Sequence, residues 1–135
     1  MIDSICLDTR ILSRFLNGNQ AARNLILEWQ ENGFEVYTTM VNVTEIFNGL
    51  LKISRLSDQK RAELDSLFAT LHPRELDYAT AVKAGELAAM QLQGLDIGWR
   101  DLFMAAIVSC NGNRIITSNV EHFKRVPGID VIEYS

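Results

Sequence analysis

The stretch SICLDTRIL, residues 4–12, decides the fold of this chain. Its first four residues form a short apolar run, which predicts a buried strand. Apolar residues then continue at helical spacing as far as Leu16, and Asn17-Gly18 ends the pattern. An Asp or Thr before such a run is a signal for the start of a helix. Asp8 is therefore predicted at the junction between the end of a strand and the start of a helix.

The same alternation continues along the chain. Further strands are predicted at residues 34–37, 114–117 and 131–132, with a weaker one at 74–76. Helices are predicted at about residues 21–30, 40–51, 58–68, 78–93, 101–110 and 120–124. Short, continuously apolar strands that alternate with helices imply a parallel sheet covered on both faces. The expected fold is α/β, a three-layer α/β/α sandwich with a short central parallel sheet, in a single domain over residues 1–135.

Composition is that of an ordinary globular protein of 135 residues, with 47% hydrophobic and 22% charged residues. Cys6 and Cys110 both lie in apolar runs, which predicts two buried free thiols rather than a disulfide or zinc site. We expect no signal peptide and no membrane span, and therefore a cytoplasmic protein. A net charge of −4 argues against broad binding of nucleic acid. It leaves room for a local site in which acidic side chains hold a divalent cation.

Polar residues are predicted to share one edge of the sheet, beyond the strand ends, where ligands bind in open parallel sheets. Asp8 follows the first strand, Glu45 lies in the helix after the second, and Asp101 heads a later helix. Ser118 and Asn119 follow the third strand. Asp8 and Asp101 could instead be helix caps, and Glu45 could lie on a solvated helix face. Several carboxylates at one edge are tolerated mainly when a cation lies between them, and oxygen ligands favour Mg²⁺ or Mn²⁺.

Four blocks of sequence follow one another from end to end: LDTRIL (7–12), YTTMVNVTEIFNG (37–49), DLFMAA (101–106), and IITSNVEHF (115–123) with VPGI (126–129). In these blocks the chain resembles the PIN-domain nucleases, and among them the VapC-type toxins of toxin–antitoxin pairs. The resemblance implies a metal-dependent endoribonuclease whose invariant acids match Asp8, Glu45 and Asp101. It also implies Mg²⁺ or Mn²⁺ as the cofactor, single-stranded or loop RNA as the substrate, and hydrolysis by metal-activated water.

Two positions depart from the pattern of that family. A fourth acid of the family falls at Asn119, which lacks the charge and could hold water or phosphate instead. Arg10 stands where a small polar residue is more usual, so it could bind substrate phosphate or weaken metal binding at Asp8. With Thr117 and Ser118, these two residues are candidates for positioning substrate or water.

The sequence gives weaker predictions for the other polar residues. His72 is predicted to be structural, and His122 to be a surface or turn residue. Five basic residues could guide an RNA backbone or could simply be solvated surface: Arg10, Arg14, Arg100, Lys124 and Arg125.

Two other classes of function stay open on the sequence alone. One is a PIN-fold module that binds RNA or a protein partner with little or no catalysis, which the departures at Asn119 and Arg10 favour. The other is a phosphatase with an aspartyl nucleophile, which would need a second acid where Arg10 stands.

The family resemblance also implies a homodimer and a cognate antitoxin partner. Apolar residues near 50–51 and 64–68 could form contact surfaces or belong to the core.

Overall fold

The structure is a computed structural model that describes residues 2–135. The strands are β1 (Ser4–Leu7), β2 (Glu35–Tyr37), β3 (Arg114–Thr117) and β4 (Asp130–Glu133). The helices are α1 (Thr9–Leu16), α2 (Gln20–Glu31), α3 (Met40–Lys52), α4 (Asp58–Leu71), α5 (Tyr78–Ala89), the short 3₁₀ helix η1 (Met90–Gln93), α6 (Trp99–Ser109) and α7 (Val120–Lys124). The predicted alternation of strands and helices is confirmed.

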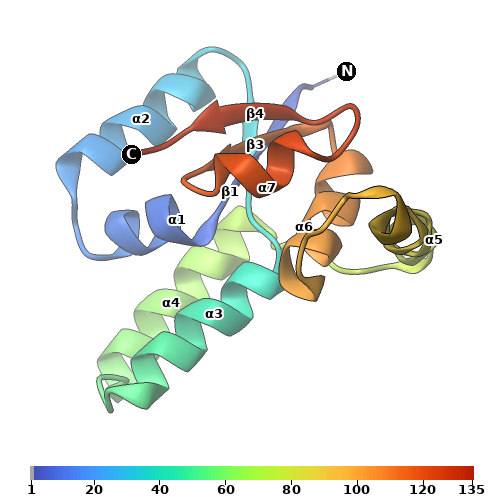
Figure 1. The fold of residues 1–135 in the computed structure, drawn as a ribbon. Coiled ribbons are helices and arrows are strands. Elements are labelled where there is room, and N and C mark those ends of the chain that lie inside the picture. Colours follow the sequence, from blue (N-terminus) through green and yellow to red (C-terminus); the bar gives the residue numbers. More distant parts are fainter. Residues whose placement is uncertain (1) are drawn as a thin grey trace.

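All strand pairs in the sheet are parallel, in the order β2-β1-β3-β4 (Figure 1). The strand β1 lies between β2 and β3, with Cys6 paired to both Tyr37 and Ile115. Because the strands run in one direction, their carboxyl ends lie along one edge. Asp8 follows β1 at that edge and Ser118 follows β3 beside it.

Successive residues of each strand point to opposite faces of the sheet, and both faces are covered. Ile5 and Leu7 of β1 pack with Ile26 of α2 on one face. On the other face, Cys6 packs in a cluster that contains Ala84 of α5 and several residues of α6. The three-layer α/β/α prediction is therefore confirmed.

Helices α3 and α4 lie side by side and project beyond the edge of the sheet (Figure 1). Ile46 of α3 packs with Leu64 and Phe68 of α4, and Leu12 of α1 joins the same cluster. Leu64 and Phe68 are buried, so these two belong to the core rather than to a contact surface. Leu51, by contrast, is 60% exposed.

Three local predictions were wrong. Residues 74–76 form no strand, because only an isolated bridge joins Arg74 to Thr39. Cys110 is exposed rather than buried, since it follows the last turn of α6; both cysteines are free, and only Cys6 is buried. The sixth α-helix begins at Trp99 with Gly98 as its N-cap, so Asp101 lies inside the first turn and is not a cap.

The turn between α6 and β3 requires a glycine. Gly112 has a φ of +100°, and a β-carbon at this position would lie 3.2 Å from the backbone oxygen of Ser4. A side chain here would meet both an unfavourable backbone conformation and the first residue of β1. The Asn-Gly stop predicted after α6 thus also allows β3 to begin close beside β1.

No helix within residues 2–135 is both long and apolar enough to cross a membrane.

Candidate active site

Asp8 lies where β1 ends and caps α1, so the N-cap interpretation of this residue is confirmed. Its Oδ1 accepts a hydrogen bond from the backbone N–H of Thr9 at 2.7 Å and from Asn42 Nδ2 at 3.1 Å. Its Oδ2 accepts a hydrogen bond of 2.6 Å from the hydroxyl of Thr117. The residue is only 4% exposed. This carboxylate is held by groups from β3, α1 and α3.

Glu45 reaches the same edge from α3 because the start of that helix is fixed. Thr39 and Asn42 form a capping box, in which each side chain bonds the backbone N–H of the other. Asn42 lies three residues before Glu45, so both side chains share one face of the helix. Thr9 then links the two, since its hydroxyl accepts from Asn42 Nδ2 at 2.9 Å and donates to Glu45 Oε1 at 2.5 Å.

Asp101 is buried in the first turn of α6, 5% exposed. Its Oδ2 accepts hydrogen bonds from Asn119 Nδ2 at 2.8 Å and from His122 Nδ1 at 2.6 Å. A carboxylate has no proton to donate, so His122 Nδ1 carries the hydrogen in this pair. Asn119 and His122 are one turn apart at the start of α7, and both point at the same oxygen.

Arg100 connects all three carboxylates. One nitrogen, Nη2, lies 2.7 Å from Asp8 Oδ1 and 2.6 Å from Glu45 Oε1, and Nη1 donates to Asp101 Oδ1. Burial disfavours the charged guanidinium, but the hydrogen bonds to Glu45 and Asp8 and their negative charges outweigh that effect. They raise the pKa of Arg100 above its usual value, so the side chain stays charged.

The carboxylates of Asp8 and Asp101 open into a cavity of about 520 Å³. Its lining also includes Arg10, Arg100 and Asn119. Exposed Ser118 also lines it, so three of the four predicted positioning residues lie around this cavity, whereas Thr117 is buried and bonds Asp8.

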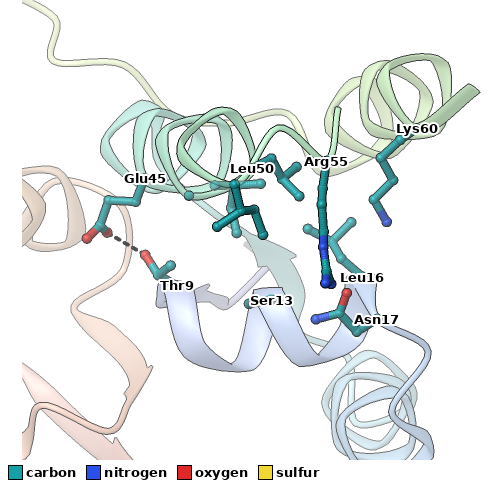
Figure 2. Close-up of a pocket in the computed structure, with 11 residues that line it drawn as sticks. Thr9, Ser13, Leu16, Asn17, Glu45, Leu50, Arg55 and Lys60 are labelled. Atoms are coloured by element: carbon teal, nitrogen blue, oxygen red, sulfur yellow. Dashed lines mark hydrogen bonds between the residues drawn. The ribbon is translucent and has the colours of Figure 1, made fainter. Parts of the chain in front are cut away.

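A second cavity of about 380 Å³ adjoins the first through Thr9 and Ser13. Figure 2 shows Glu45 and its hydrogen bond to Thr9 at one end of this second cavity, with Arg55 and Lys60 at the other. Glu45 therefore lies at one end of a cavity whose other end carries two basic side chains.

The structure brings the predicted acids together and adds residues that the sequence analysis missed. His122 was predicted to be a surface or turn residue, and its side chain is 39% exposed, but its contact with Asp101 was not predicted. Arg100 was considered as a guide for RNA or as solvated surface, and instead it pairs with the carboxylates. Asn42 was not singled out at all. Each of the three had a local signal: Asn42 precedes Glu45 by three residues, His122 follows Asn119 by three, and Arg100 adjoins Asp101.

Comparison with known proteins agrees with this fold. The model of the PIN domain family matches residues 5–129, which is most of the chain. The chain belongs to the PIN domain family. One relative of this PIN domain is Ribonuclease VapC2 of Rickettsia felis, 25% identical over 124 residues, covering 91% of this chain and 92% of the relative.

Solved structures share the fold. VapBC2 of Rickettsia felis, bound to a DNA fragment from its promoter, matches with a TM-score of 0.82 at 22% identity, over 98% of this chain and 99% of that one. A toxin–antitoxin complex from Klebsiella pneumoniae matches with a TM-score of 0.68 at 18% identity, over 93% of this chain and 95% of that one.

The side chains of this PIN domain fit a hard divalent cation in their chemistry. The three carboxylates, with the nearby hydroxyl oxygen of Thr117, form a donor set made of oxygen, which Mg²⁺ and Mn²⁺ prefer. Yet no three His, Cys, Asp or Glu side chains in residues 2–135 are arranged to hold an ion together. The guanidinium of Arg100 lies among these carboxylates instead. The donors are thus suited to a metal, while their present arrangement is that of an ion-paired cluster.

Proposed function

We propose that this protein is a Mg²⁺- or Mn²⁺-dependent endoribonuclease and the toxin of a type II toxin–antitoxin pair. The observation that carries this proposal is the convergence of Asp8, Glu45 and Asp101, from three separate elements, on one edge of a PIN-domain sheet. Carboxylates gathered at such an edge repel one another, and a function that needs a cation there accounts for the arrangement. Similarity to Ribonuclease VapC2 supports RNA as the substrate.

In this proposal Asp8 and Asp101 are the principal metal ligands, and Glu45 is a ligand directly or through water. A divalent ion would supply a Lewis acid, which eases deprotonation of water and stabilises negative charge on the phosphate. Thr117 holds Asp8 in place, and Asn119 holds Asp101. Other side chains are placed to bind substrate: Arg10 and Ser118 line the cavity beside the acids, and the basic residues Arg55 and Lys60 line the adjoining one.

The test is cleavage of four labelled nucleic acids: a single-stranded RNA, an RNA hairpin, an RNA duplex and a single-stranded DNA. Each is incubated with Mg²⁺, with Mn²⁺ and with EDTA. We expect cuts in the single-stranded RNA and the hairpin loop, none with EDTA, and recovery when metal is added back. Asp101→Asn, purified in parallel, should lose at least about a hundredfold in rate, more than the loss typical of residues that only orient a ligand.

Cleavage that persists in EDTA, or at the wild-type rate in Asp101→Asn, would come from a contaminating nuclease or another site and would contradict the proposal. A second candidate is a PIN module that binds RNA or protein with little cleavage. Arg100 favours it, since this side chain already neutralises the three carboxylates. Binding of the hairpin without cleavage in Mg²⁺ or Mn²⁺ would select this second candidate.

An antitoxin partner is supported by the similarity to chains of toxin–antitoxin complexes. We also propose a homodimer, supported by exposed apolar side chains along one region of the chain. These are Leu76, Tyr78, Val82, Leu92 and Trp99, of which Tyr78 is 87% exposed and Leu92 96%. Burial of such side chains against a second copy would remove apolar surface from water.

Light scattering should therefore give the mass of a dimer for the wild-type protein. The double substitution Tyr78→Ser and Val82→Ser, on one exposed face of α5, should shift the mass toward the monomer. The substitution Leu27→Ser, at a half-exposed position on α2, is the matched control and should leave the dimer intact. A monomeric wild-type protein would rule out the homodimer.

A further inference from the structure

Arg100 occupies the position that a cation would need in order to serve all three carboxylates. Its Nη2 atom is shared by Asp8 Oδ1 at 2.7 Å and Glu45 Oε1 at 2.6 Å, and its Nη1 atom bonds Asp101 Oδ1. One planar group thus contacts one oxygen of each acid. The other oxygens of Asp8 and Asp101 face protein donors, namely Thr117 and the pair Asn119 and His122. On Asp101, the oxygen that Asn119 and His122 leave for an incoming ion is the one that Arg100 contacts. On Asp8 and Glu45, the guanidinium shares its carboxylate oxygen with Thr9.

A divalent ion and the guanidinium cannot share these oxygens. Asp8, Glu45 and Asp101 would hold Mg²⁺ through carboxylate oxygens, and the guanidinium now contacts one oxygen of each. Two cationic groups at such short range also repel each other strongly when partly removed from water.

The side chain of Arg100 has room to leave. It is 33% exposed, whereas the side chains of Asp8 and Asp101 are 6% and 7% exposed. It belongs to the second residue of α6 and lines the 520 Å³ cavity, so a change of rotamer can move the guanidinium into that cavity without moving the helix.

We propose that Arg100 is an intramolecular counter-ion that competes with the divalent cation for Asp8, Glu45 and Asp101. The metal-free protein is then held in an ion-paired, closed arrangement, and metal binding requires the release of Arg100. This inference rests on the proposed function, because it assigns to the same carboxylates a metal that the proposed nuclease would use. It adds that Arg100 lowers the affinity of these carboxylates for the divalent cation.

The experiment measures the affinity for Mn²⁺ by isothermal titration calorimetry, with free Mn²⁺ followed by electron paramagnetic resonance. The proteins are the wild type, Arg100→Gln and Arg10→Gln. We expect Arg100→Gln to bind Mn²⁺ at least about tenfold more tightly, within the range usual for coupled binding events. Arg10→Gln removes the same charge from the lining of the same cavity, but among the arginines and lysines of the described residues only Arg100 forms ion pairs with the three carboxylates. It should therefore give a much smaller gain.

Each of the other outcomes overturns the inference, but they differ in whether the metal site of the proposed function is also rejected. Equal affinities in wild type and Arg100→Gln would mean that Arg100 does not compete, while the metal site of the proposed function would stand. Equal gains in Arg100→Gln and Arg10→Gln would mean that net charge, not occupancy, limits binding. An absence of Mn²⁺ binding in all three proteins would remove both the inference and the metal dependence of the proposed function.

Arg100→Gln leaves three carboxylates without their shared partner, so it could fail to fold. In that case the inference is tested on the wild-type protein, by following the Nε–H signal of Arg100 in nitrogen-15 NMR spectra. Saturation with Mg²⁺ should shift this signal and speed its exchange with water, because the guanidinium moves from the acids into the open cavity. An unchanged Arg100 signal at saturating Mg²⁺ would overturn the inference.

Discussion

Asp8→Asn is expected to abolish RNA cleavage while the protein stays folded. The amide oxygen can keep the hydrogen bonds that Asp8 Oδ1 accepts from Thr9 and Asn42. The amide nitrogen would face Thr117, whose hydroxyl can accept as well as donate. What disappears is the negative charge at the centre of the acid cluster. Activity should fall by at least about a hundredfold, which exceeds the usual effect of residues that only orient a metal ligand.

Asp96→Asn is the matched control, because it removes a negative charge away from the acid cluster. Asp96 is 95% exposed, so its substitution makes the same change of one carboxylate to an amide on the surface. Cleavage rates on the RNA hairpin and thermal unfolding curves should be measured for both variants beside the wild type. Asp96→Asn should match the wild type in both. Asp8→Asn with more than a tenth of wild-type activity would mean that Asp8 serves mainly as the cap of α1.

The predictable part of this fold is the part set by short-range pattern. Residues 5–7 are uniformly apolar because β1 lies between two other strands and is covered on both faces, as its burial in two different clusters shows. The Asn-Gly pairs mark the ends of α1 and α6 because Gly18 and Gly112 adopt positive φ. A strand was wrongly predicted at residues 74–76. Only Arg74 pairs there, through a single bridge to Thr39, and one bridge does not make a strand.

The acids of the candidate site were predictable because each lies near the carboxyl edge of a parallel sheet. Asp8 directly follows β1, Asp101 lies in the first turn of α6, and Glu45 lies in the helix that follows β2. Their partners were harder to predict. Arg100 looks like a surface residue in sequence, and only the approach of β1, α3 and α6 turns it toward three acids. His122 likewise depends on the packing of the short α7 beside α6. Local spacing marks which residues are neighbours on one element, but contacts between elements follow from the tertiary fold.

His122→Ala should lower cleavage by roughly 10–100-fold, the range usual for residues that orient a metal ligand. His122 Nδ1 donates to Asp101 Oδ2 at 2.6 Å, and Asn119 Nδ2 donates to the same oxygen at 2.8 Å. Together these donors fix the rotation of the Asp101 carboxylate, so its other oxygen faces the cavity side of the site. Without His122 the carboxylate can turn, and a metal ion would find its ligand in the wrong orientation for part of the time.

The decisive comparison is between His122→Ala and His122→Asn. An asparagine side chain can place an N–H near the position of histidine Nδ1, so His122→Asn should recover much of the activity and of the Mn²⁺ affinity that His122→Ala loses. The side chain of His122 is 39% exposed, so neither variant should change the unfolding temperature greatly. Equal losses in the two variants would show that the imidazole ring itself is needed, whether for contact with RNA or for proton transfer. Full activity in His122→Ala would show that Asn119 alone holds Asp101 in place.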